Sequence, residues 1–314
     1  MEYTTLGRTG LKVSVAGFGC GGKSRAGQGS GKSTADSVAL IHRAMDQGVN
    51  FFDTARSYGT ESILGAAIKG RPRDAVIIST KNHESGVSAE QLVSAIDVSL
   101  KELQTDFIDV FHLHGVGPEV YDHAINELAP AMLREQERGK IRFLGITETS
   151  PNDHGQKMLQ RAVTDDCWDV MMLGFNMMHQ VARTRLFPQT SKQKIGTLIM
   201  FAVRSLFSVP GRLEKTMGKL AEEGRVPAWL GERETPLDFL LGDGGADSVI
   251  EAAYRFARHE PGADVVLFGT GDTAHLDANI QSILKPPLPE PTRAKLTDLF
   301  GHLEGIGLDG PGAR

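Results

Sequence analysis

Eight short apolar segments recur along the chain, and stretches with helical periodicity separate them. Most are rich in Val, Ile and Phe, which is typical of parallel strands buried on both faces. Regular alternation of such strands with helices, without a second apolar core, predicts a (β/α)8 barrel that occupies residues 1–314 as a single domain. The predicted strands are residues 13–20, 49–55, 75–81, 107–114, 141–147, 169–176, 196–203 and 264–271.

Local signals mark several helix boundaries and two departures from the repeat. Ser33 with Asp36, and Ser88 with Gln91, have the spacing of capping boxes that begin helices. An extra hairpin at the N-terminus, turning at residues 7–10, is expected to close the bottom of the barrel. Residues 205–232 are expected to form a long loop after the seventh strand, and a loop of this length is usually a lid or a binding loop.

The composition excludes several functional classes. A formal charge of −5 gives no basic surface for nucleic acid or for an anionic membrane. Cys20 and Cys167 are too few for a disulfide framework and suit a reducing compartment. No apolar run approaches the roughly 18 residues of a membrane span. We therefore expect a cytoplasmic protein without a nucleic-acid or membrane partner, and the sequence does not indicate its oligomeric state.

Four reactive side chains follow consecutive predicted strands. Asp53, Lys81 and His114 end the second, third and fourth strands, and Tyr58 follows the second by a short loop. In a (β/α)8 barrel such positions meet at the C-terminal mouth. There, Tyr58 can act as a general acid or base towards a carbonyl oxygen, because the nearby Lys81 ammonium lowers the pKa of a phenol. Asp53 would keep Lys81 charged, and His114 would orient the substrate oxygen.

The chain resembles the aldo-keto reductase superfamily. The matching segments are LGRTGLKVS from Leu6, GFG at 17–19, FFDTARSYG at 51–59, STK at 79–81, DFIDVFHLH at 106–114, KIRFLGIT at 140–147 and GFN at 174–176. The resemblance implies an oxidoreductase that uses NAD or NADP to interconvert carbonyls and alcohols, with Asp53, Tyr58, Lys81 and His114 as its catalytic tetrad.

The resemblance also implies a set of cofactor contacts, which match the family less well than the tetrad does. Thr147, Glu148 and Met172 stand where the family commonly has Ser, Asn and Gln on the nicotinamide carboxamide, and Phe201 stands where an aromatic ring stacks on the nicotinamide. The end of the eighth strand leads into a helix N-terminus, which suits a phosphate. The remaining expected cofactor residues are Gly19, Asp53, Arg204, Gly269, Thr270, Gly271 and Asn279.

The side chains that would hold a 2′-phosphate are largely missing. Gly269 and His275 occupy places where relatives often have Lys and Arg, and Asp272 would repel a phosphate. This favours NAD slightly over NADP, although Arg204 or the long loop can still supply a cation.

The expected substrate pocket is open and polar on one side. His83 and Gly21 replace bulkier residues of many relatives, and this suits a hydroxylated substrate such as a sugar. Lys23 and Trp229 are expected to line the same pocket.

Three other interpretations are open. His112 and His114 share one face of a strand and form a possible metal pair, which would indicate a metal-dependent barrel hydrolase. A cofactor-binding, redox-sensing regulatory subunit with little turnover is the second. Residues 26–33, AGQGSGKS, match a loose phosphate-loop pattern, but a barrel is the wrong context for it, so a flexible substrate loop is expected there.

Overall fold

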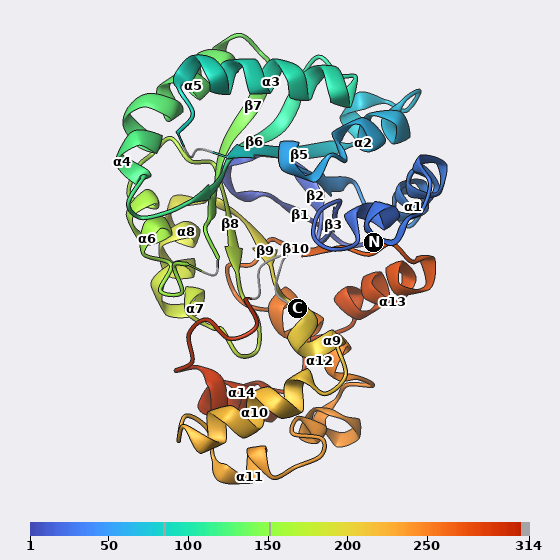
Figure 1. The fold of residues 1–314 in the computed structure, drawn as a ribbon, viewed down its shortest axis with the longest axis vertical. Coiled ribbons are helices and arrows are strands. Elements are labelled where there is room, and N and C mark those ends of the chain that lie inside the picture. Colours follow the sequence, from blue (N-terminus) through green and yellow to red (C-terminus); the bar gives the residue numbers. More distant parts are fainter. Residues whose placement is uncertain (84–85, 151, 309–314) are drawn as a thin grey trace.

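Eight parallel strands close into the predicted barrel (Figure 1). The computed structural model describes residues 1–83, 86–150 and 152–308, and in this part of the chain the strands follow one another in sequence order, with the last pairing the first. The strands are β3 (Ala16–Gly19), β4 (Phe51–Asp53), β5 (Ile77–His83), β6 (Ile108–Val116), β7 (Ile141–Glu148), β8 (Val170–Gly174), β9 (Gly196–Met200) and β10 (Val265–Phe268). Each of the eight predicted segments therefore overlaps one barrel strand, and β5, β6 and β7 extend one or two residues past the predicted ends.

An antiparallel hairpin precedes the barrel and closes its bottom, as predicted. Strand β1 (Tyr3–Thr5) pairs with β2 (Lys12–Ser14), so the first predicted segment holds the end of the hairpin as well as β3. Leu6 and Val13 of the hairpin pack into one interior cluster with Phe51 of β4. Gly7 has a φ of +48°, and a Cβ there would lie 2.2 Å from the backbone nitrogen of Gly196, so only glycine lets the hairpin approach β9 this closely.

The helices pack around the strands, and both predicted capping boxes are present. Ser33 caps α1 (Thr34–Asp46), and Ser88 caps α3 (Ala89–Leu103). No helix in the described part of the chain is both long and apolar enough to cross a membrane. The other helices around the barrel are α2 (Glu61–Ile68), α4 (Tyr121–His123), α5 (Ala129–Glu137), α6 (Lys157–Ala162), α7 (Ala182–Arg185), α8 (Phe187–Gln193), α12 (Val249–Arg258) and α13 (Thr273–Leu284).

The segment predicted as a long loop is largely helical, so that prediction is wrong. It contains α9 (Ser205–Ser208), α10 (Arg212–Glu222) and α11 (Ala228–Gly231). A further helix, α14 (Glu290–Phe300), was not predicted. In Figure 1, α10, α11 and α14 are grouped beyond α12, away from the strands. We call these three helices the helical lobe. Apolar side chains of α10 on one face, Leu213, Met217 and Leu220, are buried, which explains why the segment is ordered.

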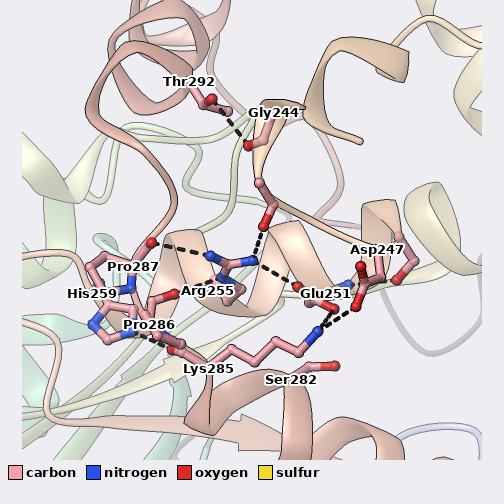
Figure 2. A network of polar contacts seen from close by, with 12 residues as sticks. Gly244, Asp247, Glu251, Arg255, His259, Ser282, Lys285, Pro286, Pro287 and Thr292 are labelled. Carbon is pink, nitrogen blue, oxygen red and sulfur yellow. Dashed lines mark hydrogen bonds and ion pairs between the residues drawn. The ribbon is translucent and has the colours of Figure 1, made fainter. Parts of the chain in front are cut away.

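A buried arginine holds the chain between the barrel and the helical lobe (Figure 2). Arg255 of α12 is 6% exposed, pairs with Glu251 at 2.7 Å and donates to the carbonyl oxygens of Gly245, Pro286 and Pro287. Because Pro286 and Pro287 lead from α13 towards α14, this guanidinium fixes the path of the chain into the lobe.

Candidate active site

A buried ion pair forms the base of the candidate site. Lys81 on β5 is 1% exposed, and its Nζ lies 2.6 Å from each carboxylate oxygen of Asp53 and 2.7 Å from the carbonyl oxygen of Thr54. Burial lowers the pKa of Lys81, but the charge and hydrogen bonds of Asp53 together with the Tyr58 phenol outweigh it, so the net direction is upward. The structure thus gives this amine a fixed position and keeps it charged.

Tyr58 lies above this pair and against a histidine. Its ring centroid is 5.2 Å from Lys81 Nζ and 5.7 Å from the His114 ring, which meets it edge-on at 88°. A short 3-10 turn, Arg56–Tyr58, presents the ring, and Gly59 ends that turn at a φ of +69°. The structure therefore brings all four tetrad residues together.

The electrostatics of Tyr58 differ from the expectation in one respect. Burial raises the pKa of the phenol above its ordinary value, and the Lys81 ammonium acts against this without reversing it. The Lys81 charge does lower the pKa of Tyr58, as predicted. The prediction of a net decrease is wrong, because burial raises this pKa by more than the charge lowers it. The phenol is protonated at neutral pH and is held ready to donate.

His114 is a neutral imidazole. Burial, reinforced by the charge of Lys81, lowers its pKa to about 2. Its Nδ1 is buried without a hydrogen-bond partner among the described residues, and its ring stacks on His83 at 4.3 Å. His83 is exposed, so the stacked pair presents imidazole edges at the mouth.

Two polar residues lie below the tetrad, and one of them, Ser79, was not identified from the sequence. Ser79, two residues before Lys81 on the same face of β5, donates to Asp53 at 2.8 Å. His112 Nε2 lies 3.0 Å from the Ser79 hydroxyl, one layer below His114 as expected. Side chains two residues apart on a strand face the same side, so the position of Ser79 two residues before Lys81 could have indicated that it lies below Lys81.

The expected substrate residues lie in different environments. A Cβ on Gly21 would lie 2.3 Å from the Tyr58 ring, so the tyrosine occupies the space that was expected to be open. Lys23 is exposed on the following loop. Trp229 belongs to α11, where Arg233 and Lys295 lie 4.8 and 5.6 Å from its ring, so its contacts are in the helical lobe and the pocket expectation for it is wrong.

Two of the three residues expected to bind the nicotinamide carboxamide have polar side chains, and the third is apolar. Thr147 accepts a 2.7 Å hydrogen bond from Gly115 N, next to His114. Glu148 is buried and accepts from Gly174 N at 3.0 Å, while its Oε2 has no partner among the described residues. Met172 packs in the interior cluster and offers only apolar surface. Of these three residues, Thr147 and Glu148 therefore supply the hydrogen-bonding groups for a carboxamide.

An aromatic ring and a cation lie at the end of β9. Phe201 has a φ of +64°, and the Arg204 guanidinium lies 4.8 Å from its ring centroid. Arg204 also approaches Gly22, because a Cβ there would be 3.8 Å from Arg204 Nη1, and its charge acts to lower the pKa of Tyr58. This cation thus lies beside the tyrosine, between the ends of β9 and β3.

Close backbone approaches surround the end of β10. A Cβ on Gly269 would be 2.9 Å from the Gly19 oxygen, and one on Gly271 would be 2.7 Å from Gly27 Cα. Asp272 caps α13 by accepting from His275 N at 3.0 Å, and its own backbone amide donates to Thr270 Oγ1 at 3.0 Å. Asn279 is half-buried in the second turn of that helix.

Residues 26–33, expected to form a substrate loop, contain local turns in the structure. They include most of the segment Arg25–Ser30, in which two short 3-10 turns are separated by a kink at Ala26 and Gly27 and backbone hydrogen bonds such as Gly27 N to Ser24 O at 2.7 Å close the segment. The turn packs against Gly271, on the β10 side of the mouth. Among the described residues, no three His, Cys, Asp or Glu side chains are grouped so that they could hold a metal ion, and His112 and His114 gain no third ligand.

Comparisons with known proteins agree with this geometry. The sequence profile of the Aldo/keto reductase family matches residues 18–299. The chain is 30% identical over 302 residues to the aldo-keto reductase YhdN of Bacillus subtilis, covering 88% of this chain and 87% of that one. It is 39% identical to L-galactose dehydrogenase of Arabidopsis thaliana over 157 residues, which is 47% of this chain and 48% of the relative.

A solved structure has the same fold. The aldo-keto reductase AKR11C1 of Bacillus halodurans, in its holo form, superposes with a TM-score of 0.75 over 98% of this chain and 100% of that one, at 22% identity. At this identity the likeness concerns the fold.

Proposed function

Because the chain belongs to the aldo/keto reductase family, we propose that it interconverts a carbonyl compound and an alcohol with a nicotinamide nucleotide, and that Tyr58 transfers the proton. The observation that carries the proposal is the convergence of Tyr58, His114 and the buried Lys81–Asp53 pair at the C-terminal end of the strands. Such ends are where (β/α)8 enzymes carry their chemistry.

The residues present fit a nicotinamide nucleotide. Glu148 Oε2 is a buried acceptor without a partner among the described residues and can accept from the carboxamide. Phe201 presents a ring at the end of β9, and the N-terminus of α13, which follows β10, offers backbone amides to a phosphate. When bound, the nucleotide supplies or accepts the hydride.

The chain's own residues handle the proton. In reduction, the Tyr58 hydroxyl donates its proton to the substrate oxygen, and in oxidation the phenolate takes it back. Lys81 stabilises the phenolate, and Asp53 holds Lys81 in place by two hydrogen bonds. The neutral imidazole of His114 orients the substrate oxygen by a hydrogen bond.

We further propose NAD as the preferred nucleotide and a sugar as the substrate. Asp272, exposed at the start of α13, is ionised, since hydrogen bonds from His275 N and neighbouring groups lower its pKa, and its charge opposes a 2′-phosphate. The stacked imidazoles of His83 and His114 can exchange hydrogen bonds with several hydroxyl groups. The similarity to L-galactose dehydrogenase, though limited to about half of that protein, supports a sugar.

The test is a screen of turnover followed by nicotinamide absorbance. Purified protein would be assayed with NAD⁺ and NADP⁺ against aldoses including L-galactose, and with the reduced nucleotides against aldehydes and cyclic ketones. Turnover of at least one substrate is expected, and NAD⁺ should be preferred. Tight nucleotide binding without turnover would instead support a redox-sensing subunit, and absence of both would contradict the proposal.

A further inference from the structure

A buried carboxylate at the mouth of the barrel lacks half of its hydrogen bonds. Glu148 is the last residue of β7 and is 3% exposed. Its Oε1 accepts from Gly174 N at 3.0 Å and from the Ser150 hydroxyl, but its Oε2 has no partner among the described residues. Buried polar atoms are nearly always satisfied, so an orphaned acceptor at the edge of a site points to a ligand.

The carboxylate lies beside an aromatic ring, and the residue before it contacts the segment that follows His114. A Cβ built on Gly174 would be 3.0 Å from Glu148 Oε1, from Phe201 Cδ2 and from Leu308 Cδ2, so the acid and the ring meet at Gly174. On the other side, the preceding residue, Thr147, accepts from the amide of Gly115, which follows His114. A flat group whose reacting carbon faces Tyr58 would therefore pass close to Glu148.

The surroundings of Glu148 leave its charge unbalanced. Ser150, Gly174 and the Gln156 amide are neutral, and Leu308 is apolar. Asp153, a like charge, acts on it from its own loop. On the β9 side the charged residue is Arg204, whose guanidinium lies over the Phe201 ring and extends towards Gly22. Burial, opposed by hydrogen bonds from Ser150, Gly174 and the Gln156 side chain, raises the pKa of Glu148 to about 7.

We propose that the Glu148 carboxylate selects the oxidised over the reduced nicotinamide, and so favours alcohol oxidation by this chain. The oxidised ring carries a positive charge and the reduced ring is neutral, while the rest of the nucleotide is shared. A buried carboxylate beside the ring therefore stabilises one redox form, whereas a neutral amide at the same place would treat both nearly alike. This inference rests on the proposed function.

The test compares the affinities of the two redox forms. Dissociation constants for NAD⁺ and NADH, and for NADP⁺ and NADPH, would be measured by calorimetry in the wild type and in Glu148→Gln, which keeps the shape and removes the charge. The preference for the oxidised form should fall at least about tenfold in the variant. Glu222→Gln, on the exposed face of α10, is the matched control and should leave the ratio unchanged.

A pH series on the wild type gives an independent readout if the variant does not fold. Glu148 gains its charge as the pH rises through about 7, so the affinity ratio should move towards the oxidised form between pH 6 and 8.5. Binding of both forms with a ratio that neither the variant nor pH alters would overturn this inference alone. Failure to bind any of the four nucleotides would overturn the proposed function itself.

Discussion

The buried pair of Asp53 and Lys81 should be strongly coupled in the stability of the fold. Each of the three ammonium protons of Lys81 has an acceptor, two on Asp53 and one on Thr54 O. Asp53→Leu leaves a buried, uncompensated ammonium, and Lys81→Met leaves a carboxylate held mainly by the Ser79 hydroxyl. Each single change should therefore lower the free energy of unfolding by about 3–5 kcal/mol.

Replacing both members should cost far less than the sum. Asp53→Leu with Lys81→Met removes both charges and fills the site with apolar atoms, so the double variant should be no less stable than either single one, with a coupling energy of about 3 kcal/mol or more. Urea unfolding at pH 7 measures this. Asp122→Asn, which breaks the exposed pair with Arg161, is the control and should scarcely move the midpoint. Additive losses in the double variant would refute the reasoning.

Three further outcomes are expected. Gly21→Ala should reduce turnover sharply with a smaller effect on nucleotide affinity, since its Cβ would lie 2.3 Å from the Tyr58 ring; steady-state kinetics with calorimetry checks this. The free energy of unfolding should fall as the pH drops below about 6.5, because His112 and His114 bind protons in the unfolded state but stay neutral in the folded state, where their pKa values are depressed. The melting temperature of His112→Asn should therefore depend less on pH than that of the wild type. Arg255→Met should destabilise the helical lobe by about 3 kcal/mol or more while nucleotide affinity stays unchanged, and an unaltered rate of amide exchange in α14 would contradict this.

The sequence allowed the barrel and the tetrad to be predicted because both depend on local signals. Buried parallel strands are uninterrupted apolar runs, and their last residues face a common mouth. The helical lobe was missed although Leu213, Met217 and Leu220 have helical spacing, because α10 has no capping box and lies where a loop is usual. Trp229 was placed in the pocket because nothing local indicates that α11 packs on α14.

Features that depend on tertiary approach were not predictable. The closeness of Gly21 to the Tyr58 ring joins two loops whose separation is set by the barrel. The net pKa of Tyr58 is a balance between burial and the Lys81 charge, and sequence supplies only the charge. The missing partner of Glu148 Oε2 likewise becomes visible only when every neighbouring donor has a position.

The most direct test of the account is the kinetic and binding analysis of Tyr58→Phe. This change removes one hydroxyl and keeps the ring that packs on Gly21 and His114. We expect turnover to fall by at least about 100-fold, as for the loss of a general acid, while the nucleotide dissociation constant remains within a few-fold of the wild-type value. Turnover that survives the substitution unchanged would contradict the assignment of Tyr58 as the proton donor.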